Sequence, residues 1–209
     1  MPYELHSSSD CCYPGTTCLI NKFDIRNEKE LSLIETGITV AKSSELMRNP
    51  LPGKFDFEHL KAIHKYLFGD LYDWAGEIRT TNLSKKGTSF ADAKSIERMA
   101  RNCFRRLNEA VFFINLSFDE YTIQIADFYN TLNLIHPFRE GNGRAQRCFM
   151  AQLVQKAGYG IDFSKIDSDE LMIATIYAAQ GINDFLICFF RSNLTELKRP
   201  VFDGGITLI

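Results

Sequence analysis

The stretch HPFREGNGRAQR, residues 136–147, decides the fold. It holds the titratable His136, the carboxylate of Glu140, an asparagine between two glycines, and the arginines Arg144 and Arg147. Helical patterns lie on both sides of the stretch, so it is predicted to be a loop that enters a helix. Backbone N–H groups at a helix N-terminus, with glycines and arginines beside them, bind polyphosphate groups. A histidine at the edge of such a site indicates transfer of part of a nucleotide to a hydroxyl.

The residue types in this stretch are those that bind a nucleotide in complex with Mg²⁺. A single carboxylate such as Glu140 is a typical protein ligand of Mg²⁺, whose other positions go to phosphates and water. Glycine lets the backbone approach phosphate oxygens closely, and the two arginines lie one helical turn apart. Each feature alone is more often structural: a histidine that ends a helix, a simple turn or a solvated helix face. Their combination in one short stretch favours the functional interpretation.

The rest of the chain predicts an all-α domain. Apolar residues recur every three or four positions in most segments between turn signals. About seven or eight helices are therefore expected, together with one short β-hairpin over residues 77–91. The helices are expected over residues 27–48, 57–68, 92–111 and 118–135, from the motif to Gly158, and over residues 169–179 and 183–197.

Three parts of the chain are expected from these patterns. Residues 1–26 are predicted to be an irregular N-terminal segment, residues 27–197 the helical domain, and residues 198–209 a C-terminal tail. The second helix carries two histidines five residues apart, a poor spacing for metal ligands. We expect His64 to be packed in the core and His59 to lie at the surface.

Composition excludes several classes of protein. The chain has 209 residues and a formal net charge of −2, which argues against direct binding of nucleic acid or of an anionic membrane. No apolar run reaches the roughly 18–20 residues that span a membrane, and the N-terminus has no secretory signal pattern. The six cysteines lack the paired spacing of a zinc site. A cytoplasmic protein with no membrane partner is expected.

The motif resembles a known signature. Residues 136–147 match the pattern His-Pro-Phe-x-x-Gly-Asn-Gly-Arg-x-x-Arg of the Fic (filamentation-induced-by-cAMP) family at every defined position. Residues 71–79 (LYDWAGEIR) are similar to the family's segment before its target-binding flap, and residues 82–91 are similar to the flap hairpin. Parts of residues 13–23 are similar to the N-terminal segment of many single-domain members. The resemblance implies the Fic fold, in which helices surround a central motif loop and helix.

The resemblance also implies an activity. Fic proteins mostly transfer AMP from ATP to a Ser, Thr or Tyr hydroxyl of a target protein and release pyrophosphate. His136 would then be the base that deprotonates the hydroxyl, and Glu140 would hold Mg²⁺ or Mn²⁺. Glycine at position 143 favours AMP transfer, because the phosphorylating branch of the family carries lysine there. The implied nucleotide-binding residues of the motif are Gly141, Asn142, Gly143, Arg144, Ala145, Gln146 and Arg147, with Arg147 at the terminal phosphate.

Residues outside the motif are also implied in binding. Lys85 in the flap is expected near the nucleotide or the target, and Asn133 and Asn183 are expected to approach the nucleotide. The flap is expected to hold the target backbone by strand addition. Phe138 is expected to anchor the motif loop in the core.

One glutamate is a candidate for inhibition. Many Fic proteins are inhibited by a helix with the pattern Ser/Thr-x-x-x-Glu-Gly/Asn, whose glutamate pairs with the second motif arginine, here Arg147. Residues 32–36 (SLIET) place the serine three rather than four residues before Glu35, and residues 192–197 (SNLTEL) lack the final residue type. Glu35 is the candidate inhibitory glutamate, with a solvated helix face as the alternative. Truncation of the chain and control by a separate small antitoxin stay open as further alternatives.

Three functions compete at this point. The first is AMP transfer by an enzyme of toxin or effector type, and the second is transfer of UMP, phosphate or phosphocholine. The third is a non-enzymatic module that binds a peptide at the flap, although binding alone needs neither His136 nor Glu140. The expected partners are ATP and a target protein, such as a type II topoisomerase subunit, a small GTPase or the chain itself.

Overall fold

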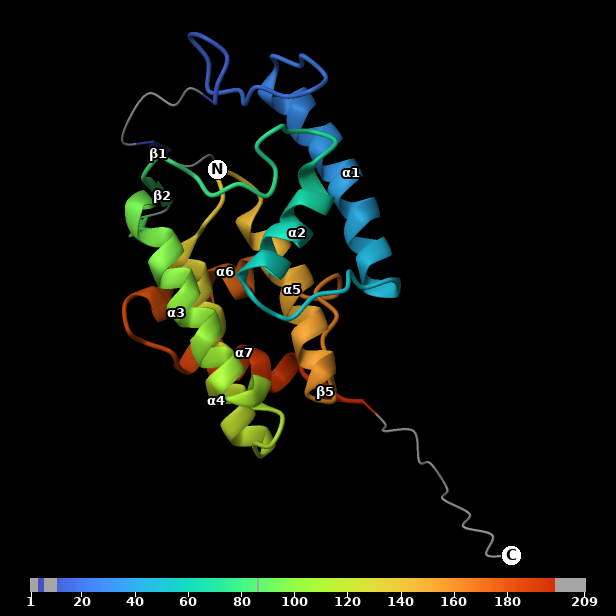
Figure 1. Ribbon diagram of the computed structural model, residues 1–209, viewed down its shortest axis with the longest axis vertical. Helices are drawn as coiled ribbons and strands as arrows, with labels where there is room; N and C mark the ends of the chain where they lie inside the picture. Colours follow the sequence, from blue (N-terminus) through green and yellow to red (C-terminus); the bar gives the residue numbers. More distant parts are fainter. Residues whose placement is uncertain (1–3, 6–10, 86, 198–209) are drawn as a thin grey trace, which may run out of the picture.

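The computed structural model describes residues 4–5, 11–85 and 87–197. Within these ranges the chain forms an all-α domain, as the sequence predicts, with two small antiparallel sheets (Figure 1). The expected tail, residues 198–209, lies outside the described residues. The α-helices of the described ranges are α1 (Glu28–Arg48), α2 (Phe57–Phe68), α3 (Ile96–Glu109), α4 (Phe118–Ile135), α5 (Asn142–Lys156), α6 (Ser168–Ala179) and α7 (Asp184–Asn193).

Side-chain caps fix where the first two helices begin. The side chain of Asn27 accepts the N–H groups of Lys29 and Glu30 at the start of α1. Asp56 accepts the N–H of His59 at the start of α2. Such caps satisfy N–H groups that no carbonyl of the helix can reach. Both helices therefore begin where the sequence predicts.

The expectation for His59 is wrong, because its side chain is buried. The loop between α1 and α2 packs on the ring: a Cβ added at Gly53 would lie 2.2 Å from it. The Nε2 of His59 lies 3.0 Å from the carbonyl of Leu51 in the same loop. The apolar pattern of α2 does not reveal this cover, because it comes from the preceding loop.

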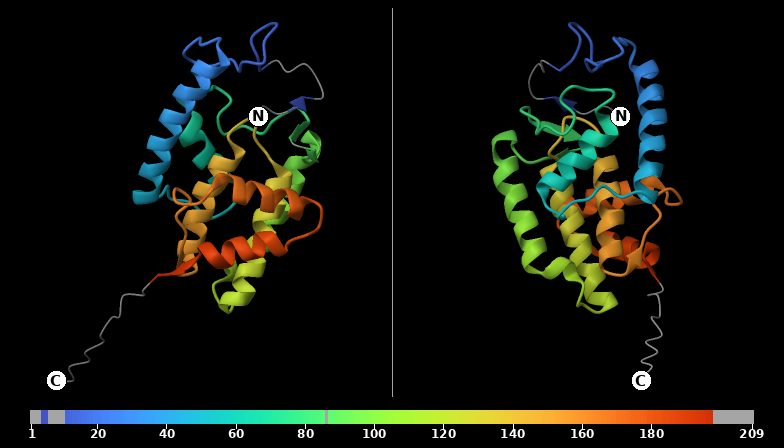
Figure 2. Two further views of the ribbon diagram at one scale, coloured as in Figure 1. Left: turned by 180° about the vertical axis from the view of Figure 1, so that it is seen from behind. Right: turned by 45° about the vertical axis from the view of Figure 1, so that its right-hand side comes forward.

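Helices α4 and α5 form the centre of the domain. Helix α4 contacts α3, α5, α6 and α7, and helix α5 contacts α1, α2 and α4. Figure 2 shows α1 (blue) along the outer flank in the upper part of the molecule and α7 (red) in its lower part. Leu132 of α4 and Phe149 of α5 are fully buried between these layers. The two central helices meet at the motif loop, which the surrounding helices hold in place.

The expected hairpin forms, but it is shorter than predicted. Strands β2 (Leu83–Lys85) and β3 (Thr88–Ser89) pair antiparallel, with Ser84 opposite Ser89. Residues 78–81, expected in the first strand, lie outside it because the N–H of Arg79 donates to the carbonyl of Pro137 in the motif loop at 2.8 Å. Strand β1 (Glu4–Leu5) adds to the other edge of β2, giving the order β1-β2-β3. The sequence predicts no strand there.

A second small sheet ends the described chain. Strands β4 (Tyr159–Gly160) and β5 (Thr195–Glu196) pair antiparallel. The helix expected over residues 183–197 therefore ends four residues early, in α7 at Asn193. Leu194 is extended, and the following β-branched Thr195 pairs with Gly160. The helix expected over residues 92–111 is divided into a short 3₁₀ turn, Ala93–Ser95, and helix α3.

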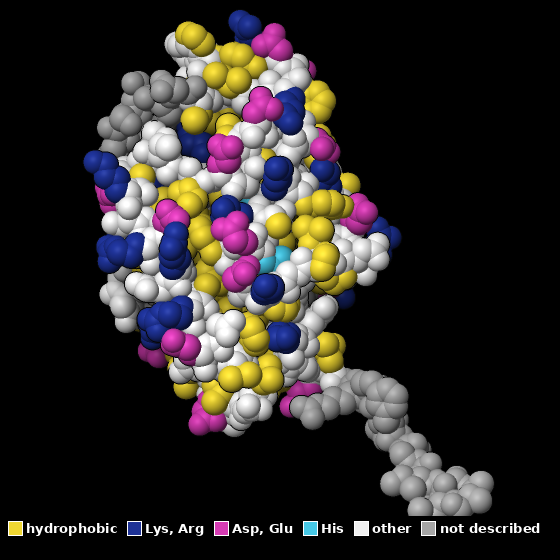
Figure 3. Space-filling model, viewed as in Figure 1, with side chains coloured by type: hydrophobic (Ala, Val, Ile, Leu, Met, Phe, Trp, Pro, Cys, Tyr) yellow, Lys and Arg dark blue, Asp and Glu magenta, His cyan; other side chains and the backbone are white. Residues whose placement is uncertain are grey.

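The surface shows no separation of charge that would mark a nucleic-acid or membrane face on the side seen in Figure 3. Lys and Arg side chains alternate there with Asp and Glu side chains. Mixed charge of this kind gives little net field over that face. Among the described residues, no helix has the length and apolar character needed to cross a membrane.

Candidate functional site

The motif loop, residues 136–141, joins the end of α4 to the start of α5. Asn142 folds this loop: its side-chain oxygen accepts the N–H of Phe138 at 2.8 Å, and its amide donates to the carbonyl of Phe138 at 2.7 Å. Both side chains are fully buried. Phe138 therefore anchors the loop in the core, as expected, and the side chain of Asn142 shapes the loop from within.

His64 supports the loop from helix α2. Its ring is stacked on Phe138, with centroids 3.8 Å apart. Its Nε2–H donates to the carbonyl of Glu140 at 2.9 Å, and its Nδ1 accepts the N–H of Gly76 at 2.9 Å. Burial lowers the pKa of His64 to about 4, so the ring is neutral at pH 7 and keeps this tautomer. The expected core position is confirmed, and the bond to Glu140 fixes the backbone of the candidate metal ligand.

His136 lies at the C-terminal end of α4 with a left-handed φ of 45°. Its Nδ1 is 3.0 Å from the carbonyl of Asn133; a carbonyl only accepts, so Nδ1 carries the proton and Nε2 the lone pair. The ring of Phe90, from the flap, stacks on the imidazole at 3.7 Å between centroids. Burial, with added effects of the cations Arg79 and Lys85, lowers the pKa of His136 to about 3. The ring is thus a neutral base covered by a flap residue.

The buried rings of His64 and His136 predict a loss of stability in mild acid. Both have folded-state pKa values below the unfolded value of about 6.5, so the unfolded chain binds more protons below that pH. The stabilisation is complete above about pH 6.5 and falls by up to about 1.4 kcal/mol per histidine for each lower pH unit. Urea unfolding at pH 7, 6 and 5 should therefore show a smaller pH dependence in His64→Gln than in the wild type. If the free energy of unfolding depends on pH equally in both proteins, His64 is not neutral and buried. An NMR titration of the wild-type ring checks its protonation state independently.

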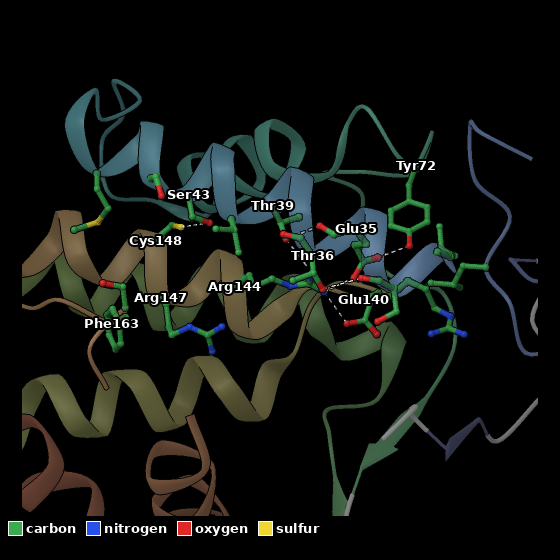
Figure 4. A pocket seen from close by; sticks show the side chains of 18 of the residues that line it. Glu35, Thr36, Thr39, Ser43, Tyr72, Glu140, Arg144, Arg147, Cys148 and Phe163 are labelled. Atoms are coloured by element: carbon green, nitrogen blue, oxygen red, sulfur yellow. Dashed lines mark hydrogen bonds and ion pairs between the residues drawn. The ribbon is translucent and has the colours of Figure 1, made fainter. Parts of the chain in front are cut away.

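A cavity of about 1310 Å³ lies between α1 and α5 (Figure 4). Glu140, Arg144 and Arg147 of the motif line it, and Lys85 reaches it from the flap. His136 is not among the residues that line it, because the imidazole lies under the flap. The cavity therefore brings together the candidate metal ligand and both motif arginines, beside the loop that begins with the candidate base. From α1 the lining residues include Glu35, Thr36, Thr39, Ser43 and Met47.

The N-terminus of α5 is built to bind an anion. Gly141 at the N-cap has a φ of 79° and no side chain with which to cap the helix. The first-turn N–H groups carry the positive end of the helix dipole, equivalent to about half an elementary charge. Arg144 and Arg147 add positive charge next to it, although the guanidinium of Arg144 is also paired with the carboxylates of Glu35 and Glu140. An elongated polyphosphate matches this arrangement better than a single phosphate does.

Glu35 pairs with the first motif arginine, whereas the sequence pattern suggested the second. Its Oε1 accepts from Nη2 of Arg144 at 2.6 Å, and its other oxygen accepts the hydroxyl of Tyr72. Arg144 also donates to Thr39 at 3.3 Å and to Glu140 at 3.4 Å. The alternative of a solvated helix face is wrong, because Glu35 is only 9% exposed. Figure 4 shows this network between α1 and α5.

Several expected binding residues lie away from the cavity. Ala145 and Gln146 are buried on the core side of α5, where the Gln146 amide donates to the carbonyl of Leu132. Asn133 offers its carbonyl to His136, and Asn183 accepts from Asn130 at the start of α7. None of these four expected residues lines the cavity, and neither do Gly141, Asn142 and Gly143. A periodic pattern cannot distinguish the two faces of α5 within the motif, since arginine and glutamine are both polar.

The chain matches one protein family. The model of the Fic/DOC family matches residues 54–154. The protein adenylyltransferase VbhT of Bartonella schoenbuchensis is 37% identical over 88% of this chain, which spans 38% of the length of VbhT. The probable protein adenylyltransferase y4lH of Sinorhizobium fredii is 34% identical over 81% of this chain and 88% of its own.

Solved structures show the same fold with a nucleotide bound. The effector BepC of Bartonella tribocorum, with bound AMPPNP, is 31% identical with a TM-score of 0.84, over 90% of this chain and 97% of its own. An N-terminal Fic domain from Bartonella quintana, with bound ADP, is 32% identical with a TM-score of 0.85, over 90% of this chain and 95% of its own. Both neighbours bind an adenine nucleotide that carries a polyphosphate.

Proposed function

Because the chain belongs to the Fic/DOC family, we propose that it is a protein adenylyltransferase that transfers AMP from ATP to a hydroxyl of a target protein. One observation carries the proposal: the candidate metal ligand and two arginines line one cavity at the N-terminus of α5, and the candidate base begins the loop that leads into this helix. The relatives named above are protein adenylyltransferases or probable ones, which supports the same reaction. The neighbours with AMPPNP and ADP support the nucleotide.

The reaction forms one bond and breaks another. The oxygen of a Ser, Thr or Tyr side chain attacks the α-phosphorus of ATP, and the bond to the β-phosphate breaks so that pyrophosphate leaves. The hydroxyl proton passes to Nε2 of His136, which the bond from Nδ1 to Asn133 leaves as the basic nitrogen. The ring of Phe90 is stacked on one face of the imidazole, so a hydroxyl would approach Nε2 in the plane of the imidazole ring.

The phosphates would lie along the N-terminus of α5. Backbone N–H groups of Asn142 and Gly143 would hold the α- and β-phosphates, with Arg144 beside them and Arg147 at the terminal phosphate. The N–H of Gly141 is bonded to the carboxylate of Glu140. A positive, preorganised site of this kind stabilises charge that develops on the phosphoryl oxygens in the transition state. Lys85, which lines the same cavity, is placed to contact the nucleotide from the flap.

The cavity fits a magnesium ion that arrives with the nucleotide. Glu140 is a carboxylate at the edge of the cavity, and its Oε1 already accepts the N–H of Gly141 at 2.8 Å. No cluster of three His, Cys, Asp or Glu residues suited to a metal occurs in the described parts of the chain. One carboxylate with phosphates and water matches the usual binding mode of Mg²⁺. The ion would neutralise phosphate charge and orient the leaving group.

The target would dock at the flap. Sheet edges accept an extended peptide through backbone hydrogen bonds, and in the described sheet β3 is an outer strand. The proposal includes a toxin- or effector-type role in the cytoplasm, where ATP is supplied. The candidate targets are a type II topoisomerase subunit, a small GTPase and the chain itself, and a small antitoxin is the candidate regulator.

Position-specific labelling tests the reaction. The protein is incubated with a cell lysate and Mg²⁺ or Mn²⁺, using ATP labelled on either the α- or the γ-phosphate. We expect protein-bound label only from α-labelled ATP, and mass spectrometry should show added AMP on Ser, Thr or Tyr. Label from γ-labelled ATP would instead identify phosphoryl transfer. Labelled UTP and CDP-choline test the other transfers, and absence of label with every donor would reject the enzymatic proposal.

We propose that Glu35 restrains the nucleotide site through Arg144. Its carboxylate competes with a phosphate for the guanidinium, to which it is bonded at 2.6 Å. Glu35→Gln keeps the shape and an oxygen for the Tyr72 hydroxyl but removes the charge. We expect AMPPNP to bind several-fold more tightly by calorimetry. Glu30→Gln, an exposed glutamate on the same helix, is the matched control. Weaker binding in Glu35→Gln would show that Glu35 orients Arg144 for the nucleotide instead of restraining it.

A further inference from the structure

Arg79 lies between the flap and the motif loop and is buried. Its guanidinium donates to four backbone carbonyls. Nε donates to His136 at 2.7 Å, and Nη1 donates to Thr81 at 2.6 Å. Nη2 donates to Ala91 at 2.6 Å and to Ile135 at 3.4 Å. A planar guanidinium with five N–H groups can make these bonds at once, whereas an ammonium group cannot reach all four carbonyls in one plane.

These carbonyls belong to three separate parts of the proposed site. Thr81 comes just before the flap hairpin, and Ala91 comes just after it. Ile135 and His136 form the C-terminal end of α4, where carbonyls carry the negative end of the helix dipole. One side chain therefore joins both ends of the flap to the carbonyl of the proposed base. The main-chain N–H of Arg79 adds a bond to Pro137 at 2.8 Å.

The same bonds determine where the flap ring lies. Ala91 is held on both sides, because its carbonyl accepts from Arg79 and its N–H donates to the carbonyl of Leu134 at 2.9 Å. Phe90 is the preceding residue, and its ring is stacked on His136 with an angle of 11° between the planes. A shift of Ala91 would move this ring relative to the imidazole.

We propose that Arg79 is a positioning residue that couples the target-binding flap to His136. It holds the two ends of the flap at a fixed position relative to the backbone of His136. A target strand paired with the flap then places its hydroxyl next to Nε2 of His136. The inference rests on the proposed function, since the base and the flap have these roles only in AMP transfer. None of the four guanidinium bonds goes to Glu140, Arg144 or Arg147. Arg79 therefore acts on the hydroxyl side of the reaction and not on nucleotide binding.

Two substitutions separate this role from a general structural one. Arg79→Lys keeps the charge and loses the planar fork, and Arg79→Met keeps the bulk and loses these four bonds. Leu171→Ala removes buried packing in α6, away from the site, and serves as a control for lost stability. We expect Arg79→Lys to lower the kcat of AMP transfer by about 100-fold, because small misplacements of reacting groups have effects of this size. AMPPNP affinity should stay within about twofold, as expected for a change that does not touch the phosphate site.

NMR of the imidazole gives a readout that needs no activity. The chain has four histidines, so the ring signals can be assigned with a His136→Asn spectrum. In the wild type, the stacked Phe90 ring should shift the His136 ring protons strongly upfield. Arg79→Lys should reduce that shift, and Leu171→Ala should leave it unchanged.

The outcomes are distinct. Wild-type ring shifts and wild-type kcat in folded Arg79→Lys would overturn the coupling, as would a kcat loss that Leu171→Ala reproduces. If Arg79→Met does not fold, Arg79→Lys carries the test. If the wild type transfers no AMP, the proposed function fails, and the ring shifts still decide whether Arg79 positions His136.

Discussion

His136→Ala should abolish AMP transfer, with a loss of about 10³-fold or more, as expected when a general base is removed. The proton on Nδ1 is held by the carbonyl of Asn133, so Nε2 is the nitrogen that can accept a proton from the target hydroxyl. The low pKa of the ring, about 3, keeps it unprotonated through the neutral range. His64 cannot replace it, because both of its nitrogens are used in bonds to Glu140 and Gly76.

Two variants control this prediction: one keeps the backbone conformation at position 136, and the other alters a different buried histidine. His136→Asn is the better-tolerated change, since asparagine accepts the left-handed φ of 45° that the position requires. His59→Asn alters a buried histidine outside the cavity and should leave AMP transfer unchanged. Activity is measured as label from α-labelled ATP, and folding is measured by circular dichroism. If folded His136→Asn, with normal AMPPNP affinity, transfers AMP at the wild-type rate, His136 is not the base.

The motif and most helices can be predicted because their signals are local. The motif residues proposed to bind the phosphates lie within one short stretch, and the helices are marked by apolar periodicity and by caps such as Asn27 and Asp56. The turn residues predict the hairpin, but its first strand begins late because Arg79 is bound to the motif loop instead.

The unpredicted contacts around the candidate site join residues that are distant in sequence. Glu35 and Arg144 are 109 residues apart, and Arg79 and His136 are 57 apart. Which residues face one another across two helices depends on packing angles and rotations, which a single sequence does not reveal. Strand β1 could not be predicted for a related reason. Two residues are too few to show an alternating apolar pattern, and they are a strand only because they pair with β2. The contacts on which the proposed roles of Glu35 and Arg79 rest could therefore be found only in the structure.

Gly141→Ala should be the most disruptive small substitution in the motif, with a loss of about 3 kcal/mol or more in the free energy of unfolding. Gly141 has a φ of 79°, which strains any L side chain. A Cβ there would also lie 2.2 Å from the ring of Phe68, which is fully buried and stacked on His64. The ring cannot move without disturbing the histidine that holds the Glu140 carbonyl. We therefore expect AMPPNP binding to be lost together with stability.

Gly143→Ala is the matched control, two residues further along. Its added Cβ would meet only Nη1 of Arg147, at 3.3 Å, and that long side chain can move aside. Alanine also favours the helix by up to about 1 kcal/mol over glycine. We expect its unfolding free energy to stay within about 1 kcal/mol of the wild type, as measured by urea denaturation with circular dichroism. Equal stability of the two variants would show that the left-handed turn against Phe68 does not constrain the loop. A large difference in stability would show that the phosphate site depends on this one glycine and on the aromatic stack beneath it.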